Sequence, residues 1–277
     1  MISTLILTKN EEQDLPGCLE RLAWCDDVHV LDSVSTDRTC ELAVAQGARI
    51  SVRSFDDYAR QRNHGLGLPF RHPWLLIVDA DERIPAGLVA EMQQRVVTAP
   101  PELVAFRIRR RDFLFGRWLK HVQATPRYIR LVRPSRVEYT SRMVNEVLVP
   151  RDGGIIGDLR EPFDHYPFSK GFDHWFDKHN RYARLEAEQI LAERAAGVRF
   201  SLRQALFARD LHVRRMHQKG VLQALPFRPL TRFLLLYVLR GGFLDGRAGL
   251  VYAQLQACYE RMIVAKLDEA AHQRAGR

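Results

Sequence analysis

The sequence predicts an α/β fold, with a mostly parallel sheet flanked by helices and a helical C-terminal extension. First, β-rich apolar segments alternate with segments whose apolar residues recur at helical spacing. Second, residues 74–78 (WLLIV) are apolar at every position, which is typical of a strand in a parallel sheet covered by helices. Third, the last hundred residues contain long helical patterns and no comparable strand.

Strand and helix signals alternate along the first eighty residues. The predicted strands are residues 2–7, 28–31, 49–52 and 74–78. The predicted helices between them are residues 15–23 and 39–46, the second closed by Gly47. This βαβαβ rhythm indicates a parallel sheet, in which ligands bind at the carboxyl ends of the strands.

The rest of the chain first gives two half-exposed strands and then helices. Residues 106–111 and 128–133 alternate apolar and basic side chains. A long amphipathic helix is predicted over residues 173–196, ended by Gly197. Ser201, with Gln204 at a capping-box spacing, begins another helix that we expect to end near Gly220. Two further helical stretches follow, with Gly241-Gly242 and Asp245-Gly246 between them.

Composition limits the partners of the chain without choosing one. Its 42 Lys and Arg against 33 Asp and Glu give a formal charge of +9 over 277 residues. This favours anionic partners: nucleic acid, acidic lipid headgroups or phosphorylated substrates. The four cysteines form no CxxC pair, which is typical of free thiols in a reducing compartment.

Targeting signals are weak. The N-terminus has no basic region before a short apolar stretch, and the longest apolar run covers residues 233–239. That run is much shorter than the roughly 20 residues of a membrane-spanning helix. We therefore expect a cytoplasmic chain that can lie on a membrane.

Polar residues follow three of the predicted strands. The first leads into TKNEE, the second into DSVSTD, and the apolar strand at 74–78 into Asp79-Ala80-Asp81. Two carboxylates at positions i and i+2 of an extended segment point to the same side and can hold one divalent cation, while a diphosphate supplies further oxygens. The alternative is a solvated turn that begins a helix. The absence of GxGxxG and GxxxxGK[ST] argues against a dinucleotide fold or a P-loop.

Four segments, TKNEE, LDSVSTDRT, ARQRNHG and IVDADER, resemble in order and spacing those of the family 2 inverting glycosyltransferases. The later segments MVNEVL, FDHYPF and GGFLDGRAGL resemble bacterial β-glucosyltransferases of lipopolysaccharide core synthesis. The resemblance implies the Rossmann-like GT-A fold that binds nucleotide sugars. It places the catalytic domain at residues 1–171, with a nucleotide-sugar half up to about residue 100 and an acceptor half over 101–171. Residues 172–277 would form the helical region.

The resemblance also implies roles for individual residues. Asp81 would bind the metal, Mg²⁺ or Mn²⁺, and Asp79 the metal or the ribose. His165 would complete the metal site or contact the diphosphate, although it is equally consistent with an ordinary hydrogen-bonded histidine. The remaining donor-binding residues would be Thr8, Asn10, Glu11, Asp32, Ser33, Ser35 and Arg62.

Inverting transfer also needs a base that deprotonates the acceptor hydroxyl. Glu146 lies among apolar residues, where burial would raise the pKa of its carboxyl; it is the first candidate, and a surface strand glutamate is the alternative. Asp158 and Asp164 are competing candidates. Asp245 is expected to cap a helix, with a role in acceptor binding left open.

Two segments suggest a membrane-surface acceptor. Residues 107–136 contain ten Arg or Lys and one acid, Asp112, and could form a face for an anionic acceptor or for lipid headgroups, or simply a solvated face. In LPFRPLTRFLLLYVLRGGF, three arginines lie among large apolar residues, which suits a helix in a membrane interface or a core helix.

We therefore expect a metal-dependent inverting glycosyltransferase. It would move a sugar, with glucose as the first choice, from a UDP-sugar to a lipid-linked glycan. The first choice of acceptor is the lipopolysaccharide inner core, on the cytosolic face of the inner membrane. A polyprenyl-phosphate or other surface-polysaccharide glycosyltransferase, an inactive scaffold and a basic nucleic-acid-binding protein are the alternatives. The last lacks the RNP, zinc-finger and helix-turn-helix signatures, so no nucleic acid is expected as a partner.

Overall fold

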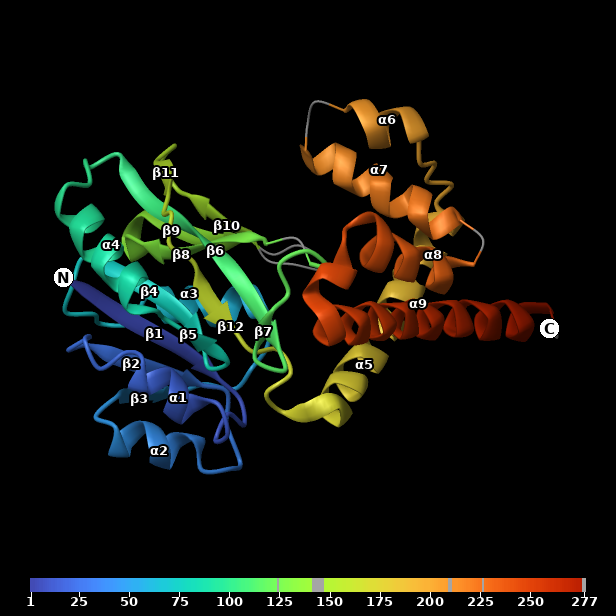
Figure 1. The fold of residues 1–277 in the computed structure, drawn as a ribbon. Coiled ribbons are helices and arrows are strands. Elements are labelled where there is room, and N and C mark those ends of the chain that lie inside the picture. The colour runs from blue at the N-terminus through green and yellow to red at the C-terminus, as the bar shows by residue number, and fades with distance from the viewer. Residues whose placement is uncertain (124, 141–146, 209–210, 226, 276–277) are drawn as a thin grey trace. The chain divides into compact units, whose positions relative to one another are not determined.

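The chain forms two compact units in the computed structural model, which describes residues 1–123, 125–140, 147–208, 211–225 and 227–275. The first unit comprises Met1–Phe113 and Thr125–Ser169, and the second comprises Leu114–Ala124 and Lys170–Arg277 (Figure 1). The predicted division after residue 171 stays a prediction. That Leu114–Ala124 belongs to the helical unit was not predicted from the sequence.

The early strands of the first unit are all parallel, as predicted. β1 (Ile2–Thr8) lies between β2 (Val28–Asp32) and β4 (Trp74–Asp79), and β3 (Arg49–Val52) pairs with β2. All four strands were expected from the sequence, and their bounds differ from expectation by no more than a residue or two at each end.

Beyond β4 the sheet is mixed. β8 (Arg127–Val132) runs antiparallel between β4 and β6 (Leu103–Leu114). β11 (Ile155–Asp158) and β12 (Phe163–His165) run parallel to β6, and β5 (Glu82–Arg83) pairs antiparallel with β12. The result is a mixed, mostly parallel sheet, which confirms the α/β prediction.

Both faces of this sheet are buried (Figure 1). Residues of α1 (Leu15–Glu20), α2 (Thr39–Ala45) and α4 (Ala86–Val97) pack on one face together with Leu76 and Val78 of β4. The opposite face is covered by α3 (Tyr58–Leu66) and by the antiparallel pair of β9 (Val137–Thr140) and β10 (Val147–Pro150). Their residues pack against the alternate strand residues, including Leu75 and Ile77. This two-sided burial explains why β4 is apolar throughout.

One helix of this unit, α3, was not expected, and α4 was expected only as the alternative to a metal site, in which the turn at Asp79-Ala80-Asp81 begins a helix. α3 is mostly polar, so it lacks the apolar stripe by which a helix is recognised. Its start is fixed instead by the Asp57 side chain, which accepts a hydrogen bond from the Arg60 backbone N–H. α4 has Pro85 immediately before its first residue. α3 is central to the site described below.

The second unit is helical, apart from the short strand β7 (Arg117–Trp118). Ala183, Ala187 and Ile190 of α5 pack against Ile263 and Leu267 of α9. Its longer helices and its short helical turns are α5 (Gly171–Ala195), α6 (Leu202–Phe207), α7 (Leu211–Ala224), α8 (Arg228–Leu234), a π-helical turn η2 (Leu235–Leu239), a 3₁₀ turn η3 (Gly242–Asp245) and α9 (Gly246–Ala275). The helix expected over 173–196 is confirmed, and Gly197, just after it, has a left-handed backbone (φ 67°).

The single helix expected from Ser201 to Gly220 is wrong. The Ser201 side chain does cap a helix, accepting from the Gln204 backbone N–H, but the chain becomes extended at Ala208. A second helix, α7, then runs through Gly220. A Cβ atom on residue 220 would lie only 2.0 Å from Cγ of the Phe200 ring. Gly220 therefore allows the ring to pack closely against the helix and does not end it.

Asp245 binds the segment Leu114–Ala124. Its carboxylate is buried and accepts hydrogen bonds from the backbone N–H groups of His121 (2.9 Å) and Val122 (2.8 Å). The His121 ring Nδ1 is 2.7 Å from the same carboxylate. These contacts give Asp245 a structural role within the second unit.

Candidate active site

The strand register brings the polar strand ends together. Leu7 of β1 is opposite Asp79 of β4, and Thr8 is opposite Asp32 of β2. The carboxyl ends of three neighbouring parallel strands therefore meet at one edge of the sheet, as the sequence predicted. This is the edge at which open α/β sheets bind their ligands.

A buried carboxylate organises the first part of this edge. Asp32 has no exposed surface. Its side chain accepts hydrogen bonds from the Thr8 hydroxyl (2.8 Å), the Ser35 backbone N–H (2.7 Å) and the Ser35 hydroxyl (2.5 Å). We call Thr8, Asp32 and Ser35 the Asp32 cluster. These neutral donors stabilise the carboxylate of Asp32 without neutralising its charge, and they fix the shape of the loop.

The neighbouring predicted residues join the two loops. The Asn10 backbone N–H donates to the Ser35 hydroxyl (2.8 Å), and its side-chain oxygen accepts from the Thr36 N–H (2.8 Å). The Glu11 backbone N–H donates to the Thr39 hydroxyl (2.8 Å). Since these contacts use backbone groups, the TKNEE and DSVSTD loops form one continuous surface.

Residue 34, which the sequence did not single out, is strained. Val34 is 47% exposed and has a left-handed backbone, with φ of 63°. This conformation is rare for a β-branched residue and costs about 1–3 kcal/mol. The Lys9 ammonium donates to the Val34 carbonyl oxygen and helps hold it there. Strain of this kind is common at ligand-binding loops.

Three consecutive residues of α3 connect three parts of the site. The Gln61 amide donates to the Ser33 hydroxyl (3.1 Å). The Arg62 guanidinium lies 3.5 Å from Asp79. Asn63 exchanges two hydrogen bonds with the Tyr139 backbone, of 2.7 and 2.8 Å. The motif ARQRNHG therefore positions both the loop after β2 and the end of β4.

An arginine lies between the carboxylates that follow β4. Arg130 of β8 is buried, and its Nη2 lies 2.7 Å from Asp79 Oδ2 and 2.5 Å from Glu82 Oε1. The other oxygen of Glu82 accepts from the Asp79 backbone N–H (2.9 Å). We call Asp79, Glu82 and Arg130 the Arg130 cluster. It supplies positive charge between the carboxylates, a role that the sequence had assigned to a metal ion alone.

The two carboxylates of this cluster respond differently to their surroundings. Burial raises the pKa of the Glu82 carboxyl to about 7, with repulsion from Asp79 adding to the effect and Arg130 opposing it. Burial alone would also raise the pKa of Asp79, but the Arg130 and Arg62 guanidinium groups hold it well below its usual range. Asp79 is therefore the anion to which both arginines are bound.

Asp81 faces a different partner. Its Oδ2 lies 3.2 Å from His165 Nε2, and His165 Nδ1 lies 2.5 Å from Asp112 Oδ1. His165 and Asp112 are opposite each other on β12 and β6, and His165 is also opposite Glu82 of β5. Burial by itself would lower the pKa of His165, but the hydrogen bonds to Asp112 and Asp81 raise it to about 9.

This arrangement fits one side of a divalent metal site. A histidine that binds a metal through one ring nitrogen usually has the other held by a carboxylate, as Asp112 holds His165. Asp81 and His165 are both partly exposed, at 28% and 14% of their side chains. Among the described residues, no group of three or more His, Cys, Asp or Glu side chains has the geometry of a metal site. A metal here would therefore take further ligands from a bound diphosphate.

The family model of glycosyl transferase family 2 matches residues 3–166, which include every strand of the site. The chain belongs to this family. The expectation of a glycosyltransferase with a GT-A fold is confirmed by this match and by the sheet that carries the site.

The chain is also similar to individual family members. It is 28% identical over 273 residues to the lipopolysaccharide core biosynthesis glycosyltransferase LpsC of Rhizobium meliloti, with 96% of this chain and 91% of LpsC aligned. It is 33% identical over 93 residues to an uncharacterized glycosyltransferase of Rickettsia typhi. That alignment covers 33% of this chain and 32% of the relative. The resemblance to lipopolysaccharide core glycosyltransferases is thus confirmed.

Solved structures resemble parts of the chain. Glucosyl-3-phosphoglycerate synthase from Mycobacterium tuberculosis, in complex with Mn²⁺, UDP and glucosyl-3-phosphoglycerate, is 21% identical with a TM-score of 0.32. Mannosyl-3-phosphoglycerate synthase from Rubrobacter xylanophilus is 17% identical with a TM-score of 0.35. The similarity covers 41% of this chain and 43% of the first synthase, and 40% of each in the second pair.

The base candidates of this family 2 enzyme differ in what the structure describes. Glu146 lies outside the described residues. Asp158 makes ion pairs with Arg107 (3.1 Å) and Arg127 (2.7 Å), and although burial opposes them, these arginines lower the pKa of its carboxyl. Asp164 is paired with Arg111 at 2.6 Å. The two arginines make Asp158 a weaker base candidate, whereas burial raises the pKa of the Asp164 carboxyl despite its arginine partner.

The arginines of the basic segment 107–136 have different surroundings. Arg130 is in the site, and Arg107, Arg111 and Arg127 are paired with acids. Arginines with carboxylate partners attract lipid headgroups less than free ones do. The one acid in this segment, Asp112, was noticed in the sequence only as an exception, yet it lies against His165.

Proposed function

We propose that this chain is a metal-dependent inverting glycosyltransferase that moves a sugar from a UDP-sugar to a lipid-linked glycan. Glucose is our first choice of sugar, and the lipopolysaccharide inner core our first choice of acceptor. The observation that carries the proposal is the Asp81–His165 pair, which lies on the same sheet edge as the Asp32 cluster. Similarity to LpsC along 96% of the chain supports the choice of acceptor.

The loop surface around the Asp32 cluster would hold the nucleotide. The loops present backbone groups and small hydroxyls, which can bind a uracil and a ribose without introducing charge. Because Asp32 is buried and fully hydrogen-bonded, a direct bond to the uracil would have to replace one of its present donors. The residues proposed for the uridine side are Thr8, Asn10, Glu11, Asp32, Ser33 and Ser35.

Asp81 and His165 would hold the Mg²⁺ or Mn²⁺ and, through it, the diphosphate. When bound, such an ion neutralises the negative charge that develops on the departing UDP. Asp112 orients the His165 ring, and Arg130 and Arg62 hold Asp79. In this arrangement Asp79 fixes the segment that carries Asp81. We therefore assign Asp79 to positioning or to ribose binding in preference to metal binding.

Glu146 remains our first choice for the base. Glu146→Gln should keep the affinity for UDP-sugar and metal, because neither ligand needs its charge. Transfer should fall by about 10²- to 10⁴-fold, the usual contribution of a positioned base. Normal transfer by Glu146→Gln, with loss of transfer in Asp158→Asn or Asp164→Asn, would assign the base to residues 158–164.

The donor can be identified directly. The protein would be incubated with a panel of nucleotide sugars and Mn²⁺ or Mg²⁺, and slow hydrolysis of each would be recorded. We expect UDP-glucose to be hydrolysed fastest, and hydrolysis to stop when the metal is chelated. Hydrolysis of none of the sugars, or the same rate after chelation, would contradict the proposal.

We also propose that the second unit binds a membrane surface. The region from the start of α8 to η3 exposes several large apolar side chains, and these are Phe227, Leu230, Leu234, Val238, Leu239, Phe243 and Leu244. Arg240 in the same stretch is exposed. Apolar side chains flanked by arginine are typical of segments that lie in a lipid interface. Among the described residues, no helix is both long and apolar enough to cross a membrane.

Vesicle flotation tests this surface. We expect the parent to float with anionic vesicles at low salt and to be released as salt rises, because screening weakens attraction to the headgroups. Leu239→Ser combined with Phe243→Ser should reduce binding about tenfold. Val97→Ser, at a residue of the first unit that is 80% exposed, is the matched control. If the double variant floats as well as the Val97→Ser control, this region does not contact the membrane.

A further inference from the structure

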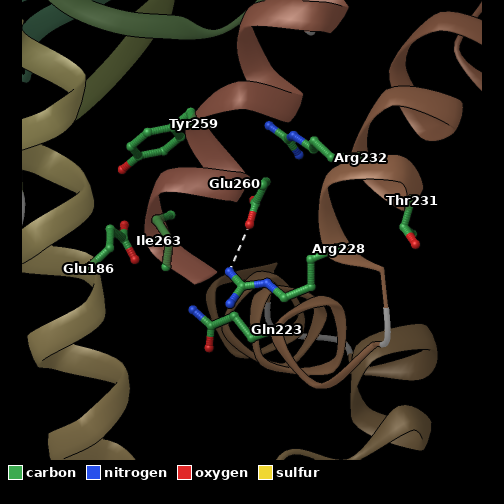
Figure 2. A pocket seen from close by; sticks show the side chains of 8 residues that line it. All are labelled: Glu186, Gln223, Arg228, Thr231, Arg232, Tyr259, Glu260 and Ile263. Atoms are coloured by element: carbon green, nitrogen blue, oxygen red, sulfur yellow. Dashed lines mark hydrogen bonds and ion pairs between the residues drawn. The ribbon is translucent and has the colours of Figure 1, made fainter. Parts of the chain in front are cut away.

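The helical unit contains a pocket that the proposed function does not use. It has a volume of about 330 Å³ and lies among α5, α7, α8 and α9 (Figure 2). Glu186 projects into it from α5, Gln223 from α7, and Tyr259 and Glu260 from α9. Arg228 and Arg232 of α8 line it as well. Its size is at the lower end of the range for small-molecule pockets.

Arg228 has a buried donor that lacks an acceptor. Its side chain is 9% exposed, and its Nη2 donates to Glu260 Oε2 at 2.7 Å (Figure 2). Its Nη1 is buried and has no hydrogen-bond partner in the described part of the chain. A buried guanidinium N–H without an acceptor is unfavourable, so an acceptor supplied by a ligand would be bound favourably.

Arg232 repeats this feature one helical turn later. Its Nη2 is 3.3 Å from Gln256 Oε1, while its Nε is buried with no partner within the described ranges. Residues four apart lie on the same face of a helix. Two neighbouring arginines therefore offer unpaired N–H donors from one helix face that lines the pocket.

The type of ligand follows from hydrogen bonding more than from net charge. The two arginines are matched by Glu186 and Glu260, so the pocket has no large excess of positive charge. Its unpaired groups are N–H donors, which a metal cation or an amine cannot satisfy. Phosphate or carboxylate oxygens can satisfy them, in hydrogen bonds stronger than those of neutral acceptors.

The opposite side of the pocket suits hydroxyl groups. Glu186 is on the α5 side in Figure 2, across from Arg232. Its carboxylate can accept from sugar hydroxyls, and the Gln223 amide can both donate and accept. Burial, together with Glu186 and Glu260, raises the pKa of Tyr259 above its usual range, so its phenol keeps its proton.

We propose that this pocket binds an anionic sugar, with phosphate or carboxylate oxygens at Arg228 and Arg232 and hydroxyls toward Glu186. The proposal concerns ligand binding by the helical unit and stands or falls independently of sugar transfer. A phosphorylated sugar and a uronic acid share the chemistry that the arginines recognise, and the experiment separates them.

The test is calorimetric titration of the full chain without donor or metal. Glucose 6-phosphate, galacturonate, glucose and inorganic phosphate are the probes. We expect one of the two anionic sugars to bind at least about tenfold more tightly than glucose, the usual effect of a charge-assisted hydrogen bond. Inorganic phosphate should bind more weakly than the preferred anionic sugar, because it lacks the hydroxyls.

Three variants locate the site. Arg232→Gln should weaken binding of the preferred sugar about tenfold and leave the Arg228–Glu260 ion pair in place. Arg228→Gln should weaken binding to a similar extent, and it also removes that ion pair. Arg194→Gln, at an exposed arginine of α5 that does not line the pocket, is the matched control. Circular dichroism confirms that each variant is folded. Binding of neither anionic sugar above glucose, or full binding by Arg232→Gln, would overturn the proposal. Equal binding of phosphate would overturn recognition of the sugar.

Discussion

The Asp32 cluster and the Arg130 cluster lie on the same sheet edge but stabilise their carboxylates differently. Asp32 is surrounded by neutral donors, namely two hydroxyls and one backbone N–H. Asp79 and Glu82 are held by a buried guanidinium. Neutral donors stabilise a carboxylate and fix the loop around it, but they leave its negative charge unneutralised. Paired charges leave groups that respond strongly when one partner changes.

The two clusters have different structural tasks at neighbouring strand ends. The Asp32 cluster joins the loops after β1 and β2. The Arg130 cluster fixes the backbone from Asp79 to Glu82, so that Asp81 turns toward His165. The two aspartates of the Asp79-Ala80-Asp81 motif therefore have different partners, and their substitution should have different consequences.

Removal of Arg130 should give the largest effect on stability. Arg130→Gln would leave Asp79 and Glu82 close together without their cation, and loss of one partner of a buried ion pair costs about 3–5 kcal/mol. Urea unfolding measures the free energy. The matched control is Arg109→Gln, an exposed arginine that donates to the Arg160 carbonyl, and it should change stability by less than about 1 kcal/mol. A loss below 1 kcal/mol for Arg130→Gln would mean that the carboxylates do not depend on it.

Substitution of Asp32 should have an intermediate effect. Asp32→Ala removes the acceptor from three donors, and buried donors left unpaired cost about 1–3 kcal/mol in all. The proposed nucleotide contact would be made in the ground state and the transition state alike, so KM for the donor should rise with little change in kcat. Steady-state kinetics distinguish the cases, and a defect in kcat alone would contradict the assignment.

The smallest effect is expected for Ser35. Ser35→Ala removes one of the three hydrogen bonds to Asp32 and the acceptor for the Asn10 N–H, while the Ser35 backbone bond to Asp32 remains. We expect a loss of about 1 kcal/mol in urea unfolding. A loss as large as that of Asp32→Ala would mean that the hydroxyl, and not the carboxylate, organises the loop.

Sequence patterns predicted the parts of the fold that depend on neighbouring residues. The strands ending at Thr8, Asp32 and Asp79 were found from apolar runs followed by polar residues, and the parallel register then brought those ends together. Gly47 was recognised as a helix end and has the left-handed backbone expected there (φ 78°). The link between a strand end and a ligand site is local, so one sequence is enough to find it.

The parts that could not be predicted depend on contacts between distant residues. Arg130 is 51 residues from Asp79, and in the sequence it is one of ten similar basic residues. Asp112 is 53 residues from His165, and only its isolation among bases was visible. Ala208 carries no sign that the chain becomes extended there. Such features depend on which strands lie side by side, and the insertion of β8 between β4 and β6 gave no signal of its own.

The central claim is that Asp81 and His165, and not the Arg130 cluster, form the protein side of the metal site. Electron paramagnetic resonance of Mn²⁺ in the presence of UDP tests it without an activity assay. We predict that Asp81→Asn and His165→Gln each weaken Mn²⁺ binding by about 10- to 100-fold or more, since even the groups that orient metal ligands contribute this much. Asp158→Asn, at an aspartate paired with two arginines, should bind Mn²⁺ like the parent. Mn²⁺ affinity within twofold of the parent in Asp81→Asn would contradict the claim.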